Sequence, residues 1–160
     1  MKQELPENLH RAFARAAALC AAREYCSFDL GRKLKSWGLA EEETALVLAR
    51  LEADGFVDEE RYARAFVQDK TRFNGWGRRK IDSLLAARQI SPQAREAAFA
   101  SLPEDSFQAR LVKLLRDKAN RLAKLEPGLR RRRLTAFGLS RGYSLNEIAS
   151  VLDELAIRDE

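Results

Sequence analysis

Basic side chains are the residues of this sequence whose types and spacing best suit binding chemistry. They gather in three stretches, and a planar guanidinium group can hold a phosphate or a carboxylate through two parallel hydrogen bonds. With one further arginine and one tryptophan, the candidates for contact with a partner or with DNA are Arg61, Lys70, Arg72, Trp76, Arg78, Arg79, Lys80, Arg110, Lys113, Arg121, Lys124, Arg130, Arg131, Arg132 and Arg133.

Two interpretations of these clusters stay open at the level of sequence. In the first, Arg78 to Lys80 and the run from Arg130 to Arg133 contact DNA or an acidic protein partner. In the second, they are solvated helix faces with ordinary ion pairs, which we favour for the individual lysines. Trp76 either covers a helix junction or is exposed as an interface anchor. Sequence-specific DNA reading is not expected, because no short helix offers base-reading polar side chains.

Residue types that perform catalysis are few and poorly placed. His10 is the single histidine, and its position near the start of a predicted helix suits a solvated side chain. Carboxylates gather at 41–43 and 58–60, where capping and the helix dipole already explain them. The segment 75–77 lacks the third glycine and the preceding strand of a dinucleotide-binding loop. We therefore expect no enzyme, no cofactor and no metal site.

The composition describes a folded chain with a modest excess of positive charge. Of 160 residues, 46% are hydrophobic and 33% charged, with a net charge of +5, which argues against global disorder. No apolar run approaches the roughly 20 residues of a membrane-spanning helix, and the first residues lack the apolar core of a secretory signal. Cys20 and Cys26 have neither a CxxC nor a zinc-site spacing, so reduced thiols in the cytoplasm are expected.

Apolar residues recur at three- and four-residue steps almost throughout, which predicts an all-α fold. The first unit should hold helices over 8–22, 27–37 and 41–55, with Ser27 as an N-cap and Gly38 and Gly55 as C-terminal stops. On the third of these helices we expect a buried stripe formed by Ala45, Leu48 and Leu51.

The pattern then restarts twice. Asp58 should cap the helix that opens the second unit, the segment 74–77 breaks it, and Ser91 with Pro92 begins that unit's last helix. The third unit should open with a long helix from 105 to about 125. On this helix Arg110, Lys113, Arg121 and Lys124 should project within about 80° of one another. A break at 126–128, a helix over 130–139 and a final helix capped by Ser144 complete the expected elements.

An internal repeat relates the three units. Leu34 and Leu85, like Leu51 and Leu102, stand 51 positions apart, and Gly38 and Gly142 stand 104 apart. We therefore predict three tandem three-helix repeats over residues 1–55, 56–103 and 104–160. Because neighbouring repeats cover each other's apolar faces, they should form an elongated, curved rod.

Several segments resemble the RecX family, the bacterial regulators of the RecA recombinase. The best match is 55–67, Gly-Phe-Val-Asp-Glu-Glu-Arg-Tyr-Ala-Arg-Ala-Phe-Val, followed by 75–81, Gly-Trp-Gly-Arg-Arg-Lys-Ile. Residues 23–30, Arg-Glu-Tyr-Cys-Ser-x-x-Leu, resemble the first-repeat motif, and Arg-Gly-Tyr at 141–143 lies in the third unit. The second repeat departs from the family's basic-Gly-Ile turn, since residues 88–90 read Arg-Gln-Ile, and this can give the helix a different ending.

The resemblance implies three three-helix repeats and a regulator without catalytic activity that acts in DNA repair, homologous recombination and the SOS response. Its implied partner is the RecA–DNA filament, in whose helical groove such proteins usually restrain strand exchange, ATP hydrolysis and coprotease function. A monomer and no membrane contact are expected. The alternative is a non-specific module that binds single- and double-stranded DNA and acts by competing for DNA, with affinity that falls steeply as salt rises.

Overall fold

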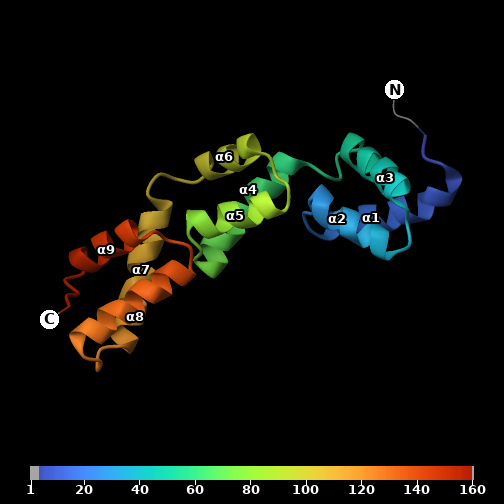
Figure 1. Cartoon of the computed structure of the whole chain (residues 1–160). Helices are drawn as coiled ribbons and strands as arrows, with labels where there is room; N and C mark the ends of the chain where they lie inside the picture. Colours follow the sequence, from blue (N-terminus) through green and yellow to red (C-terminus); the bar gives the residue numbers. More distant parts are fainter. Residues whose placement is uncertain (1–3, 160) are drawn as a thin grey trace.

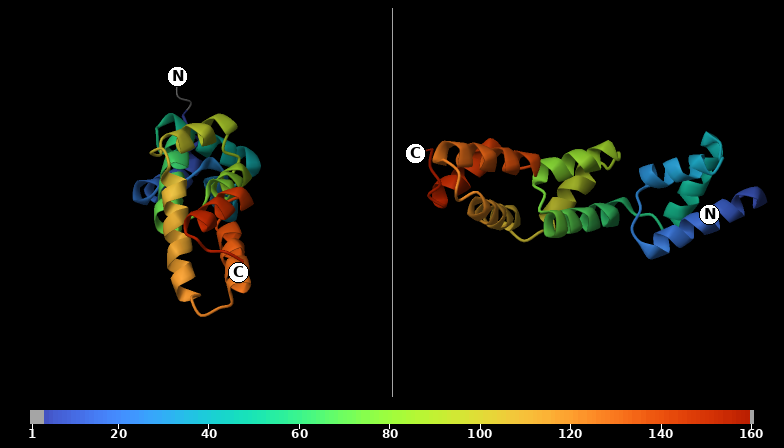
Figure 2. Two further views of the ribbon diagram at one scale, coloured as in Figure 1. Left: turned by 90° about the vertical axis from the view of Figure 1, so that its left-hand side faces the viewer. Right: turned by 90° about the horizontal axis from the view of Figure 1, so that it is seen from below.

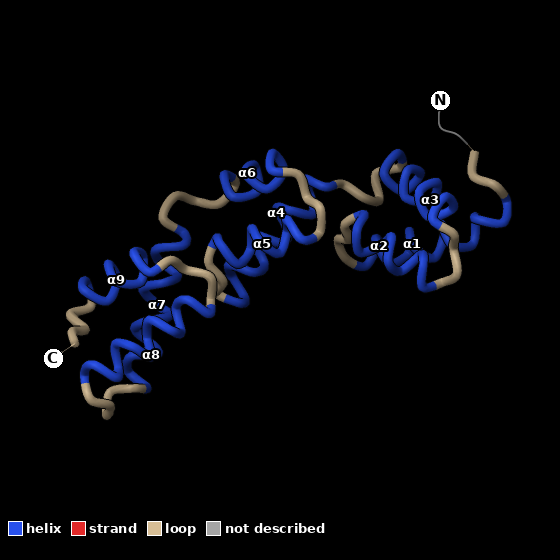
Figure 3. The backbone as a smooth tube through the Cα atoms, viewed as in Figure 1, coloured by secondary structure: helices blue, strands red, loops and turns tan. Residues whose placement is uncertain are grey.

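A computed structural model describes residues 4–159, and within this range all regular structure is helical (Figures 1 and 3). The elements are η1 (Glu7–Leu9), α1 (His10–Ala22), α2 (Ser27–Ser36), α3 (Glu41–Ala53), α4 (Glu59–Asp69), the π-helical segment η2 (Lys70–Asn74), α5 (Arg78–Ala87), α6 (Pro92–Ala100), α7 (Ser106–Arg121), α8 (Pro127–Ser140) and α9 (Leu145–Glu154). The predicted all-α class is confirmed.

The helices form three groups in a row, α1–α3, α4–α6 and α7–α9, and the chain ends lie at opposite ends of an elongated, bent molecule (Figures 1 and 2). We call the groups repeats 1, 2 and 3. The repeat architecture is therefore confirmed, whereas the boundaries at 55/56 and 103/104 stay a prediction.

Each repeat contributes its own hydrophobic core. The core of repeat 1 is built around Leu30, Leu34, Val47 and Leu51, which are fully buried. The other two cores comprise Cys26, Tyr62, Ala63, Val67, Ile81, Leu85, Ile90, Ala94, Ala98 and Phe99, and Leu111, Leu115, Ala119, Leu134, Tyr143, Ile148, Val151, Leu152 and Ile157. Cys26 of repeat 1 lies in the second core and Phe107 packs against both the second and the third, so apolar contacts continue between repeats.

The middle helix of every repeat ends in the same turn. In this turn a backbone N–H donates to the carbonyl five residues earlier: Leu39 to Leu34 (3.2 Å), Ile90 to Leu85 (3.1 Å) and Tyr143 to Gly138 (3.2 Å). This turn requires a left-handed residue, and Gly38, Gln89 and Gly142 supply it with φ of +95°, +61° and +96°. The non-glycine Gln89 therefore does not change the helix ending.

Most predicted helix starts are confirmed by their hydrogen bonds. Asp58 accepts from the N–H of Arg61 at 2.9 Å, Ser91 caps α6, and Ser144 forms a capping box at the start of α9. The prediction that Ser27 is an N-cap is wrong: it is the first residue of α2, whose cap position is Cys26 and has no side-chain hydrogen bond.

Three further expectations need correction. In α3, Ala45 is exposed, and Thr44 and Val47 are buried with Leu51 instead. Helix α7 ends at Arg121, four residues before the predicted end. Helix α8 begins at Pro127 rather than at 130, because proline suits the first helical position and the Glu126 carboxylate accepts from the N–H groups of Gly128 (3.0 Å) and Leu129 (3.1 Å). These two hydrogen bonds hold the pKa of Glu126 below its usual value.

Candidate partner-binding surface

Repeats 2 and 3 meet where the loop 74–77 lies against the turn 141–143, a contact we call the second junction. Backbone carbonyls accept most of its hydrogen bonds: Gly77 N–H donates to Arg141 (2.6 Å), the Arg141 guanidinium to Asn74 (2.8 Å) and the Tyr143 hydroxyl to Gly75 (3.2 Å). Tyr143 is buried, and burial raises its pKa to about 12. The phenol therefore stays protonated and remains a donor at neutral pH.

Glycine allows this close backbone approach. A Cβ atom at Gly77 would lie 2.5 Å from the carbonyl oxygen of Gly142, and one at Gly142 would overlap the Cβ of Lys80 and lie 2.9 Å from its backbone nitrogen. The two segments can pack backbone against backbone only because both positions lack side chains.

Lysines of repeat 2 surround Trp76 beside this junction. The Lys70 and Lys80 ammonium groups lie 5.1 and 4.3 Å from the centre of the Trp76 ring, distances at which cation–π attraction operates. Lys80 also donates to the Ser140 carbonyl at 3.3 Å. Trp76 is partly buried against the second core, as expected of a side chain that covers the helix junction, and its contact with a partner stays a prediction.

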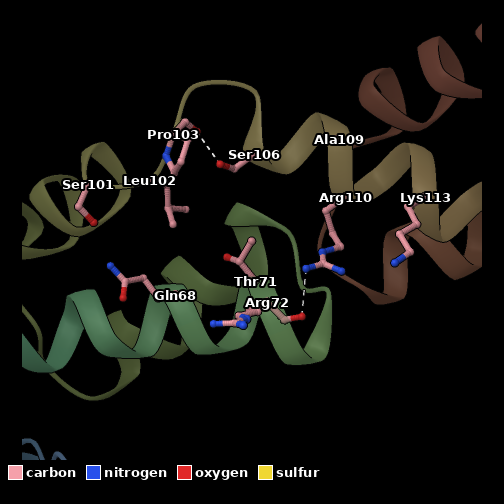
Figure 4. Close-up of a pocket in the computed structure, with 10 residues that line it drawn as sticks. All are labelled: Gln68, Thr71, Arg72, Ser101, Leu102, Pro103, Ser106, Ala109, Arg110 and Lys113. Carbon is pink, nitrogen blue, oxygen red and sulfur yellow. Dashed lines mark hydrogen bonds between the residues drawn. The ribbon is translucent and has the colours of Figure 1, made fainter.

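A groove with a volume of about 620 Å³ runs along the same side of repeats 2 and 3, between η2 and α7 (Figure 4). The Arg110 guanidinium of α7 crosses the groove and donates to the Arg72 carbonyl at 3.0 Å. Its lining residues are Gln68, Thr71, Arg72, Ser101, Leu102, Pro103, Ser106, Ala109, Arg110 and Lys113. The groove thus brings together cations from two separate clusters in the sequence, namely Arg72 from η2 and Arg110 and Lys113 from α7.

The predicted cationic face of α7 is only partly formed. Arg110 and Lys113 line the groove, and Arg121 is exposed at the helix end. Lys124 lies beyond the end of the helix, so the prediction that it shares the face of the other three residues is wrong.

The four consecutive arginines divide into two pairs. Arg130 donates to the Ala119 carbonyl at 2.9 Å. Arg131 donates to the Ile157 carbonyl and pairs with Asp153 at 3.1 Å. Arg132 and Arg133 are exposed. Arg130 and Arg131 therefore link α8 to α7, to α9 and to the residues that follow α9. Contact of any of the four arginines with a partner stays a prediction.

Repeats 1 and 2 meet through charged side chains, at a contact we call the first junction. Arg61 pairs with Glu24 at 2.6 Å and donates to the carbonyls of Gly55 (3.1 Å) and Phe56 (3.3 Å). Arg88 pairs with Asp29 at 3.3 Å. Arg61 thus links the two repeats, and this role explains the residue without contact to a partner protein or DNA.

Two predicted candidates lie at the start of α5. Arg78 is exposed and its guanidinium lies 4.4 Å from the centre of the Phe99 ring, while Arg79 is exposed. Sequence reasoning missed three residues of the region: Arg141, whose turn position hides its junction role, and Gln68 and Thr71, which show no pattern until η2 and α7 come together. It also passed over Phe73, which is 73% exposed beside Arg72.

Residues 4–159 lack the features typical of metal sites and membrane spans. In this range no three His, Cys, Asp or Glu side chains gather as metal ligands. No helix there is both long and apolar enough to cross a membrane. His10 is exposed and hydrogen bonds to the Leu5 carbonyl at 2.9 Å. Burial raises the pKa of the Cys20 and Cys26 thiols above their usual value, which disfavours the reactive thiolate.

A rod of three three-helix units places the chain in the class of helical-repeat proteins. The family model described as RecX, second three-helix domain, matches residues 58–98. Regulatory protein RecX of Thermus thermophilus is 40% identical over 121 residues, which cover 72% of this chain and 80% of that protein. Its counterpart from Mycobacterium marinum is 31% identical over 140 residues, 87% of this chain and 81% of that one. The chain belongs to the RecX family of regulatory proteins.

Solved structures agree with this assignment at the level of the fold. The crystal structure of RecX from Lactobacillus salivarius superposes with a TM-score of 0.80 at 17% identity, covering 95% of this chain and 99% of that one. A second crystal structure of a regulatory protein RecX gives 0.76 at 19% identity, covering 94% and 79%.

Proposed function

We propose that this protein modulates the RecA recombinase by binding along the groove of the RecA–DNA filament in the bacterial cytoplasm, and that it usually inhibits. The RecX family membership supports RecA as partner. The observation that carries the binding mode is the contact between repeats 2 and 3 on an elongated molecule, where Lys80 of α5 reaches Ser140 and Arg110 of α7 reaches Arg72 of η2. No catalytic step is part of the proposal: the protein acts by occupying the groove of the filament, and we propose that it does so as a monomer.

The shape supports a filament as partner better than a single subunit. A molecule built of three repeats in a row presents a surface longer than one globular contact, and can touch successive subunits of a helical polymer. Exposed arginines in repeat 2 (Arg78, Arg79) and repeat 3 (Arg132, Arg133) lie on separate repeats, so the charges can reach carboxylates or phosphates at separated points.

DNA-dependent ATP hydrolysis by RecA tests the proposal. Filaments are assembled on excess single-stranded DNA, and the protein is then added. We expect hydrolysis to fall at protein concentrations far below those that coat the free DNA, because the protein binds the filament itself. A fall that begins only when free DNA is saturated, and that disappears steeply with salt, would instead establish competition for DNA. No change at any concentration would overturn the proposal.

A further inference from the structure

The groove between repeats 2 and 3 has the charge pattern of a site for an acidic ligand. Arg72 and Lys113 are exposed along it, and Arg110 crosses it while one guanidinium nitrogen reaches the Arg72 carbonyl. No carboxylate occurs among the described residues that line it. These three positive charges are therefore not neutralised within the groove, in contrast to Arg61 and Arg88 at the first junction.

Thr71 in the floor of the groove carries a hydrogen-bonding group without a partner. Its side chain is buried, with 7% of the residue exposed, and its hydroxyl has no hydrogen-bond partner among the described residues. Thr135 in α8 shows the usual solution, since its hydroxyl donates to the Arg131 carbonyl four residues earlier at 2.9 Å. Figure 4 shows the Thr71 hydroxyl turned toward the space between Gln68 and Leu102. A buried unpaired hydroxyl costs free energy that a bound acceptor recovers.

The walls indicate which kind of acceptor fits. Leu102, Pro103 and Ala109 form an apolar wall beside the cations. A phosphate group gains nothing from such a wall, whereas a protein segment offers a carboxylate and an apolar side chain together. The volume of about 620 Å³ is within the range of sites that hold a few side chains.

We propose that this groove binds a short acidic segment of a partner protein. A carboxylate of that segment lies between Arg72, Arg110 and Lys113, an adjacent apolar side chain packs on Leu102 and Pro103, and Thr71 donates to the bound chain. Only the identity of the partner, the RecA filament, rests on the proposed function. The binding chemistry stands on the groove itself.

Nuclear magnetic resonance of the full chain tests the groove without RecA. The uniformly labelled protein is titrated with the peptide acetyl-Leu-Glu-Asp-Leu-amide, with its neutral analogue acetyl-Leu-Gln-Asn-Leu-amide and with a short oligothymidylate. We expect saturable shifts of the groove amides with the acidic peptide and about tenfold weaker binding of the neutral one, because charge-assisted hydrogen bonds are lost. Absence of saturable shifts in the groove, or tighter binding there by the oligonucleotide, overturns the proposal.

Variants separate the groove from general electrostatics. Arg72→Glu with Lys113→Glu should abolish the saturable shifts, and Arg110 is left unchanged because it bridges two helices. The matched control, Arg11→Glu with Arg32→Glu, changes the charge equally at exposed positions of repeat 1 and should bind the peptide normally. Thr71→Val should weaken binding about threefold to tenfold, the value of one hydrogen bond. Equal losses in groove variant and control overturn the proposal.

The ATP hydrolysis assay then distinguishes the two levels of inference. If the wild-type chain binds the peptide but leaves RecA unaffected, the proposed function fails and the groove stands as an acidic-peptide site. If the wild type inhibits RecA and the groove variant inhibits equally, the function stands and the groove is not the contact with RecA. Loss of inhibition in the groove variant alone supports both.

Discussion

The two junctions of this molecule join similar repeats by different physical means. At the first junction, partly exposed side chains form ion pairs, Glu24 with Arg61 and Asp29 with Arg88. At the second junction, the backbone of 74–77 lies against that of 141–143, and a buried tyrosine hydroxyl donates to a carbonyl. Side-chain pairs in high dielectric tolerate small rotations and are screened by salt, whereas buried backbone contacts allow little movement.

This difference bears on how firmly neighbouring repeats are held to one another. We infer that repeats 2 and 3 act as a rigid unit, which carries the groove and its three cations. Repeat 1 is attached by longer, more adaptable side chains, although Cys26 and Phe28 add apolar contact with the second core. A partner that binds the rigid unit first can therefore be followed by repeat 1 at small cost in strain.

Gly142→Ala should have the largest effect, because it acts on the tighter junction. The new Cβ would overlap Lys80 and would require a strained φ of +96°. We expect a loss of about 3 kcal/mol in the free energy of unfolding, from backbone strain and the clash together, measured by urea denaturation.

Gly38→Ala is the matched control for that substitution. Gly38 occupies the equivalent turn in repeat 1 with a φ of +95°, and no atom of the described residues lies within 4 Å of the Cβ that alanine would add there. It should cost only the strain of the left-handed backbone, about 1 kcal/mol. Equal losses at the two glycines would show that the second junction is not tightly packed and would break the comparison.

Arg61→Ala should have the next largest effect, this time at the first junction. It removes the pair with Glu24 and the hydrogen bonds to two carbonyls, and we expect a loss of about 1–2 kcal/mol because the side chains of Arg61 and Glu24 are 40% and 31% exposed. The loss should shrink in about 1 M salt, where the Debye length is only about 3 Å. Lys35→Ala, which breaks an exposed 3.9 Å pair with Glu41, should change stability little.

Small-angle scattering tests whether the same substitution also loosens the contact between repeat 1 and repeat 2. Arg61→Ala should broaden the distribution of distances between repeat 1 and the rest of the rod without unfolding either part. A variant that loses stability equally at low and high salt, with an unchanged scattering profile, would show that the first junction is held by packing rather than by charge.

The parts of this structure that the sequence predicts are those determined by nearby residues. The caps Asp58, Ser91 and Ser144 and the turns at Gly38 and Gly142 depend on neighbours within a few positions, and these predictions are confirmed. The predicted helix boundaries near Arg121 and Pro127 are wrong because leucine spacing continues past the first, and because Pro127 starts a helix although its sequence context indicates a break.

The candidate site depends on residues far apart in the sequence and is predicted less well. Which arginines hold the fold together is decided by the carbonyls they meet: Arg130 reaches Ala119, and Arg141 reaches Asn74, 67 positions away. Charge clustering alone does not distinguish these anchors from exposed residues such as Arg132 and Arg133. The unpaired hydroxyl of Thr71 likewise lies in the π-helical segment η2, which the spacing of apolar residues does not predict.

Gln89→Gly should have the smallest effect and the opposite sign. Gln89 occupies the turn of repeat 2 that Gly38 and Gly142 occupy in the other repeats, and its φ of +61° costs an L-residue free energy. Glycine relieves this strain but has a more flexible unfolded chain, so we expect a net gain of about 0.5–1 kcal/mol by urea denaturation. Because Gln89 lines a small cavity at the first junction with Glu59 and Arg88, the alternative is that its side chain supports that junction. A loss of stability in Gln89→Gly would establish that alternative, and would make the first junction more dependent on polar side chains than its two ion pairs indicate.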